Sequence, residues 1–125
     1  MLKILMKTGV AIFLLCLIQN AHAQKASEIY IPVGQSPGLS GTYTTLGKID
    51  LIDMQNKMIS MSDAAGNYGL KITDGTQIWL DQSLLSQKNQ MGSIHDIKIG
   101  MQAEVKYMDN KKGGDVEWIK IQLVQ

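Results

Sequence analysis

Hydrophobic and polar residues alternate with a period of two in short segments along most of this chain. The clearest example is the stretch 46–63, LGKIDLIDMQNKMISMSD, where two alternating runs flank a polar centre at 53–57. A period of two places successive side chains on opposite faces of a β-strand, and a polar centre is typical of a turn. The pattern therefore predicts a β-hairpin. Because a single hairpin cannot bury its apolar face, further strands are required.

The remaining chain supplies such strands. Asp74-Gly75 is a two-residue hairpin signal between two alternating segments. The segment 81–90 fits no strand period, and we expect it to hold at most one short helix. We predict an all-β fold, a small antiparallel barrel of five to six strands. The further predicted strands are 68–73, 76–80, 101–108 and 115–124.

The first 23 residues have the features of a cleaved signal peptide. Lys3 and Lys7 give a positively charged start, 10–18 is an unbroken apolar run, and Ala21-His22-Ala23 matches a small-x-small cleavage pattern. The run is shorter than the roughly 20 residues that span a bilayer. We expect the mature chain to start at Gln24, in the periplasm or secreted, with no membrane span. A retained anchor is the alternative.

Composition narrows the classes of function. Cys16 is the only cysteine and lies in the predicted signal peptide, which leaves the mature chain without a disulfide or a cysteine metal site. Loss of two lysines leaves 10 basic residues against 11 acidic ones, a net charge of −1, and the chain has no arginine. This balance argues against binding to nucleic acid, which depends on neutralising phosphates.

Three parts are therefore expected: the signal peptide 1–23, an N-terminal arm and linker 24–40, and a barrel domain 41–125. Pro32 limits the extended segment 28–33 to an edge strand or a free arm, and a connector rich in glycine and serine follows. The arm is either a loosely packed terminus or a strand that binds a partner.

The order of these elements resembles small exported OB-like barrels of bacterial envelopes. These include an uncharacterised domain family, the periplasmic copper and silver efflux chaperone, and accessory proteins of type IV pili. The resemblance covers about 41–122 and implies an OB-like fold and a protein partner in the envelope, with pilus or secretion assembly as one setting. The runs that carry it are GKIDLIDMQNKMISM, YGLKITDGTQI, IHDIKIGMQAEVKY and EWIKIQ.

The likeness to the chaperone raises the hypothesis of copper or silver binding. That family uses methionines, a histidine and a nearby tryptophan, and thioethers suit monovalent copper. The candidates in this chain are Met58, Met61 and His95. However, 67–73, where the family's tryptophan and paired methionines are expected, reads NYGLKIT. We favour methionine as a core filler and predict no metal and no cofactor.

Ser93, His95 and Asp96 together suggest hydrolytic chemistry, but neighbours in sequence do not form a catalytic geometry, and the chain has no glycine-framed serine elbow. A histidine that caps or hydrogen-bonds a loop is the simpler interpretation. We therefore predict that the protein is not an enzyme.

The tryptophans suggest a binding surface. If Ile78 and Leu80 point into the core, Trp79 points outward, and Trp118 does so by the same argument. Alternatively, the arm or the segment 81–99 covers this face. We predict a non-catalytic binding or accessory module that contacts an envelope protein, with a copper or silver carrier as the alternative. The candidate contact residues are Trp79, Trp118, Tyr43, Ile29, Tyr30 and Ile31.

Overall fold

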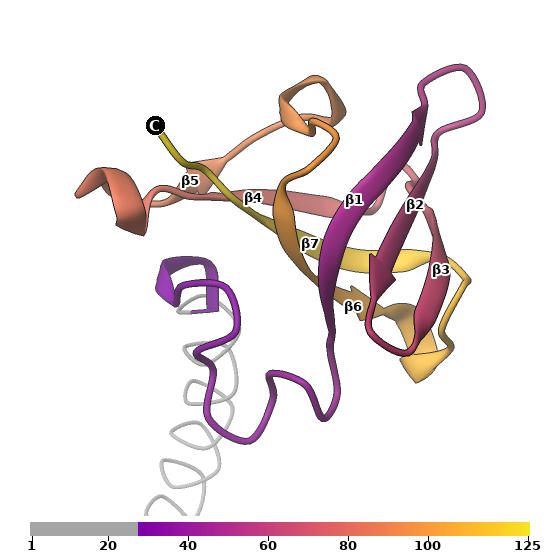
Figure 1. Cartoon of the computed structure of the whole chain (residues 1–125), viewed down its shortest axis with the longest axis horizontal. Coiled ribbons are helices and arrows are strands. Elements are labelled where there is room, and N and C mark those ends of the chain that lie inside the picture. The colour runs from indigo at the N-terminus through magenta and orange to yellow at the C-terminus, as the bar shows by residue number, and fades with distance from the viewer. Residues whose placement is uncertain (1–27) are drawn as a thin grey trace, which may run out of the picture.

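The computed structural model describes residues 28–125 (Figure 1). The predicted signal peptide, its cleavage site and residues 24–27 lie outside the described residues. Within 28–125, the fold is mostly β, as predicted, and its helices are short 3-10 turns. The strands are β1 (Thr45–Asp53), β2 (Met58–Asp63), β3 (Gly66–Lys71), β4 (Gln77–Asp81), β5 (Gln90–Met91), β6 (Gln102–Tyr107) and β7 (Val116–Gln122). The turns are η1 (Glu28–Tyr30), η2 (Ser83–Leu85), η3 (Ile94–Asp96) and η4 (Met108–Asn110).

The seven strands form one open mixed sheet in the order β3-β2-β1-β6-β7-β4-β5. The closed barrel is therefore not confirmed, although an isolated parallel bridge joins Lys71, at the end of β3, to Asp115, just before β7. The Tyr107 hydroxyl also donates a hydrogen bond to the Gly69 carbonyl of β3, at 3.0 Å. The two contacts show that the sheet curls until β3 approaches the turn between β6 and β7.

The prediction of a purely antiparallel sheet is wrong at one pair, because β4 runs parallel to β7. Asp74-Gly75 does not close a hairpin between β3 and β4. Instead, the Thr76 hydroxyl donates to the Val116 carbonyl at 2.7 Å and accepts from the Thr73 N–H at 3.0 Å, so the chain crosses to β7. The six expected strands are all present, and the short β5 raises their number to seven.

The predicted hairpin at 46–63 is confirmed as β1 and β2. Asp53 organises its turn by accepting hydrogen bonds from the backbone and side chain of Asn56, at 3.1 and 2.8 Å. A bulge between Ile49 and Leu51 adds one residue to β1. Because of this extra residue, Ile49 and Ile52 both pack toward the core although they are three positions apart.

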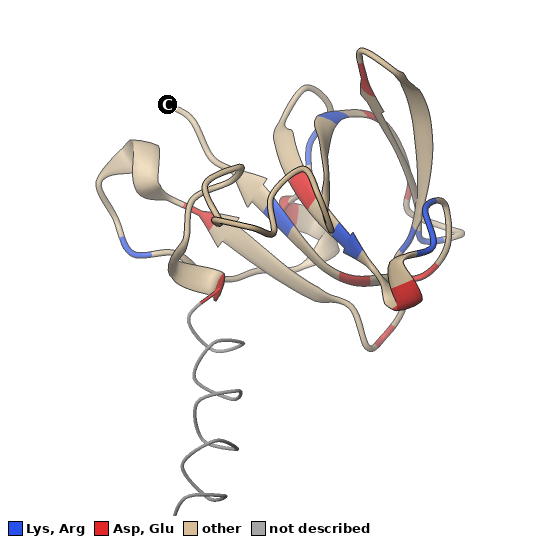
Figure 2. Ribbon diagram, turned by 90° about the horizontal axis from the view of Figure 1, so that it is seen from below, with Lys and Arg blue, Asp and Glu red and all other residues tan. Residues whose placement is uncertain are grey.

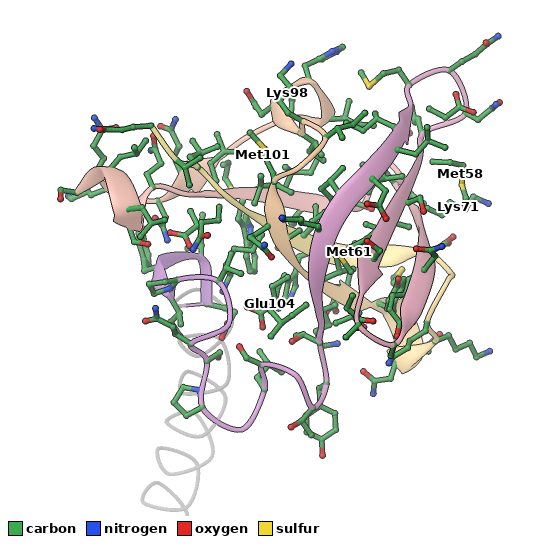
Figure 3. The ribbon with its side chains drawn as sticks, in the orientation of Figure 1. Met58, Met61, Lys71, Lys98, Met101 and Glu104 are labelled. Atoms are coloured by element: carbon green, nitrogen blue, oxygen red, sulfur yellow. The ribbon has the colours of Figure 1, made fainter. Side chains whose placement is uncertain are left out.

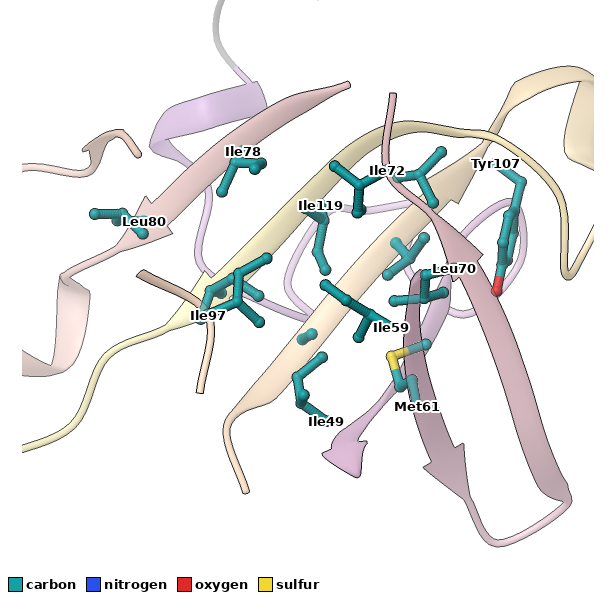
Figure 4. Packing of buried hydrophobic residues seen from close by; sticks show 14 residues of the cluster. Ile49, Ile59, Met61, Leu70, Ile72, Ile78, Leu80, Ile97, Tyr107 and Ile119 are labelled. Carbon is teal, nitrogen blue, oxygen red and sulfur yellow. The ribbon is translucent and has the colours of Figure 1, made fainter. Parts of the chain in front are cut away.

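The hydrophobic core lies on the concave side of the curled sheet (Figure 4). Most of its members are β-branched residues, which pack well on a pleated surface. Ile97, from the loop after η3, completes it. The fully or nearly buried members are Ile49, Ile59, Met61, Leu70, Ile72, Ile78, Leu80, Ile97, Ala103, Val105, Tyr107, Val116, Ile119 and Ile121.

Residues 28–44, which we call the cover segment, cross the other side of β6, β7 and β4 before entering β1 (Figure 1). The prediction of an extended segment at 28–33 is wrong, because the chain forms the 3-10 turn η1 there and makes no edge strand. A second turn follows, in which the Gln35 N–H donates to the Pro32 carbonyl at 3.1 Å. These turns bring charged and polar groups of the cover segment onto the sheet.

Candidate functional site

Trp79 and Trp118 stack on each other across the parallel pair β4 and β7. Their ring centroids are 4.8 Å apart, with an angle of 22° between the planes. They lie on the opposite face from Ile78 and Ile119, as period-two alternation requires. However, each tryptophan is only 5% exposed. The prediction of an exposed tryptophan surface is therefore wrong, and the alternative, a covered face, is what the structure shows.

A group of buried charges lies beside this stack. Lys120 Nζ lies 3.1 Å from Glu28 Oε1 and 3.9 Å from Glu104 Oε1. The same ammonium lies over both indole rings, 5.8 Å from the centroid of Trp79 and 5.1 Å from that of Trp118. Cation–π attraction strengthens when the cation is withdrawn from water. We call the fully buried Asp81, Glu104 and Lys120, together with the mostly covered Glu28, the buried charge cluster.

The cover segment supplies most of the hydrogen-bond donors to this cluster. The Val33 N–H donates to Asp81 Oδ2 at 2.8 Å, and the Gly34 N–H donates to Glu104 Oε1 at 2.9 Å. Two hydroxyls of the same segment donate to Glu104 Oε2, from Ser40 at 2.6 Å and from Thr44 at 2.7 Å. Among residues 28–125, no buried side-chain nitrogen or oxygen lacks a hydrogen-bond partner.

These contacts explain why the cover segment stays on the sheet. A buried carboxylate without donors is costly, typically several kcal/mol, and the backbone and hydroxyl donors of the segment remove that cost. Figure 3 shows Glu104 directed from the sheet toward this segment. The side of the cover segment that faces the sheet is therefore held in one position. This also limits the movement of the side that faces solvent.

The remaining predicted contact residues lie on the cover segment. Tyr30 is 66% exposed and Tyr43 is 57% exposed. Ile29 and Ile31 are half-buried, and the Ile29 carbonyl accepts a hydrogen bond from Asn89 Nδ2 at 3.0 Å. The predicted set thus divides into two buried tryptophans, two half-buried isoleucines and two exposed tyrosines.

The proposed copper or silver ligands do not come together. Met61 is fully buried in the hydrophobic core, whereas Met58 is exposed at the start of β2 and His95 is exposed on η3. Residues three apart on a regular strand point to opposite faces, so Met58 and Met61 do not converge. No group of three or more histidine, cysteine, aspartate or glutamate side chains suited to a metal occurs within residues 28–125. Met58, Met61 and His95 therefore do not reproduce the metal ligands of the copper and silver efflux chaperone.

Ser93 and Asp96 have a local structural role. They form a capping box at η3, in which Asp96 Oδ2 accepts from the Ser93 N–H at 2.7 Å and from its hydroxyl at 3.4 Å. The serine is therefore engaged with the aspartate rather than with His95. The capping that we expected from the histidine is performed by these two neighbours.

A shallow hollow of about 450 Å³ lies between the end of β1 and the loop that carries η3. Sequence reasoning did not find it, because it is formed by two segments about 40 positions apart. The run IHDIKI contained a usable signal, since it places three isoleucines beside a histidine and a lysine. The lining residues are Ile52, Met54, Ile94, His95, Ile97, Lys98 and Ile99.

Comparisons of the chain with protein-family models, with characterised proteins and with solved structures find no match. Within 28–125, no helix is long and apolar enough to cross a membrane.

Proposed function

We propose that this protein is an exported, non-catalytic binding module that acts through contacts with another protein of the cell envelope. The observation that carries the proposal is the pair of exposed tyrosines, Tyr30 and Tyr43, on a cover segment whose inner side is fixed by buried charges. Pilus or secretion assembly is a setting that agrees with the family resemblance.

Two physical arguments support a protein partner. Tyrosine is enriched at protein interfaces because its ring offers a large contact area and its hydroxyl a hydrogen bond. A surface that is already ordered before binding also loses less conformational entropy when it binds. The hydrogen bonds from Val33, Gly34, Ser40 and Thr44 to buried carboxylates provide this order.

The proposal also includes an OB-like barrel as the type of fold and export as the destination of the protein. The approach of Lys71 to Asp115 and the curl of the sheet support an OB-like barrel that is incompletely closed. The charged start, apolar run and cleavage pattern within 1–23 support export to the periplasm or beyond the cell.

The experiment is chemical crosslinking of the tagged protein in its native envelope, followed by mass spectrometry. A specific partner should be captured by the natural protein and lost when Tyr30→Ala and Tyr43→Ala are combined. The matched control is Leu84→Ala, because Leu84 is 59% exposed and lies on η2, outside the cover segment. Equal capture by the tyrosine variant would reject the proposed surface, and absence of any specific partner would reject the proposed function.

A further inference from the structure

The hollow beside η3 is a surface feature that the proposed tyrosine contact does not use. Ile97 forms its buried floor, and Ile52 and Ile94 are half-buried where they pack against the core. Met54 and Ile99 form part of the rim, and Ile99 is 65% exposed. These apolar side chains gather around one concavity, which makes the hollow a candidate for a small binding site.

The size of the hollow favours a small ligand over a protein. Its volume of about 450 Å³ lies within the roughly 300–1,000 Å³ of small-molecule sites. Seven residues line it, whereas a stable protein interface uses about 20–30 residues on each side. Met54 is flexible, so the rim can adapt to the shape of an aliphatic chain.

The polar residues at the rim of the hollow indicate which end group of an aliphatic ligand fits there. His95 and Lys98 are exposed, and among residues 28–125 neither takes part in an ion pair (Figure 3 labels Lys98). The nearest acid in sequence, Asp96, is held by the N–H and hydroxyl of Ser93, and Asp53 is held by Asn56. Two basic groups therefore stand beside an apolar surface without a carboxylate partner.

We propose that this hollow binds a single aliphatic chain that ends in a carboxylate, with the chain on Ile52, Ile94, Ile97 and Ile99 and the carboxylate at Lys98 and His95. A bilayer surface fits less well. Acidic and basic positions are interspersed along the chain (Figure 2), and attraction to anionic lipid requires a cluster of basic residues.

The probe is decanoate, titrated below its micelle concentration into the isotopically labelled exported protein. Methyl NMR signals of Met54, Ile94 and Ile99 should shift in a saturable manner, and those of Met108 and Leu84 should not. Decyltrimethylammonium carries a chain of similar length with the opposite charge, and it should bind several-fold more weakly. Equal binding of both probes, or no saturable shift with decanoate, would overturn the proposal.

Two substitutions at exposed positions test the geometry without removing core atoms. Lys98→Gln should weaken decanoate binding about twofold to fivefold, as expected for an exposed ion pair. Ile99→Asp should weaken it roughly tenfold or more, through lost apolar contact and charge repulsion. Lys88→Gln and Leu84→Asp are the matched controls, since both residues are exposed outside the hollow.

The alternative occupants give different results. Sedimentation of the protein with phosphatidylglycerol vesicles, in the absence of decanoate binding, would assign this surface to a membrane and overturn the proposal. Unchanged decanoate binding by Ile99→Asp would place the ligand elsewhere on the protein and would also overturn it. The crosslinking experiment with the Tyr30 and Tyr43 variant does not involve the hollow, so failure to capture a protein partner would leave these binding results unchanged. The two proposals are therefore tested separately.

Discussion

The ammonium of Lys120 lies 3.1 Å from the carboxylate of Glu28, 92 positions earlier in the chain. This contact joins the last strand to the first described turn and lies beside two stacked tryptophans, with the lysine side chain fully buried and the glutamate side chain 14% exposed. A charge pair in such a position is costly to break, because each partner left behind is buried without compensation. The attachment of the cover segment should therefore depend on a small number of charged groups.

Replacement of Lys120 by methionine should lower the free energy of unfolding by about 3 kcal/mol, since it leaves two carboxylates without their cation. Urea unfolding measures this loss. Lys106→Met is the control, because the ion pair of Lys106 with Glu117, at 3.0 Å, is partly exposed. Such a pair contributes less than about 1 kcal/mol. Equal losses for the two variants would contradict the importance of the buried charge cluster.

Glu28→Gln should loosen the cover segment while leaving the sheet folded. The chain contains two tryptophans, and both lie in the covered stack, so all tryptophan fluorescence reports on that cover. We expect greater quenching by acrylamide in this variant than in the natural protein, with unchanged β-sheet circular dichroism. Glu117→Gln serves as the matched control. Identical quenching in all three proteins would show that Glu28 does not hold the segment in place.

Silver ions should leave the methyl NMR signal of Met61 unchanged. Met61 is fully buried in the hydrophobic core, and the exposed Met58 and His95 lie on separate elements. A lone exposed thioether such as that of Met58 is expected to bind weakly and without saturation at stoichiometric metal. Stoichiometric binding that shifts the signals of Met61 and His95 together would restore the carrier hypothesis.

Tyr107 should make the stability sensitive to alkaline pH. Burial raises the pKa of its phenol above the usual value of about 10. Above pH 10 the unfolded state therefore loses this proton while the folded state retains it, and the free energy of unfolding falls as pH rises. Tyr107→Phe should reduce this slope, and it should cost about 1 kcal/mol at neutral pH by removing the hydrogen bond to Gly69. If the free energy of unfolding of this variant falls with pH as steeply as that of the natural protein, Tyr107 is not the cause of the dependence.

The alternation of apolar and polar residues was enough to predict the hairpin at 46–63 and a mostly β fold, because a period of two reflects local strand geometry. It also placed Trp79 and Trp118 on the face opposite Ile78 and Ile119. Local pattern does not specify strand partners, however. β4 pairs in parallel with β7, about 40 positions later in the chain, and the hydrogen bond from the Thr76 hydroxyl to the Val116 carbonyl lies beside this pair.

What the sequence by itself determined is therefore the class of fold and, in the regular strands, the side of the sheet on which a side chain lies. In β1 the bulge reverses this alternation, so that Leu51 is exposed although it alternates in phase with the buried Ile49. Only the tertiary structure decided which of those faces is exposed. Most of the donors for Asp81 and Glu104 are backbone and hydroxyl groups of the cover segment, and such groups leave no recognisable pattern in the residues. The hollow beside η3 likewise exists only because the end of β1 lies next to a loop about 40 positions later. Burial depends on contacts between residues far apart in the sequence, whereas the alternation reflects only the local geometry of each strand.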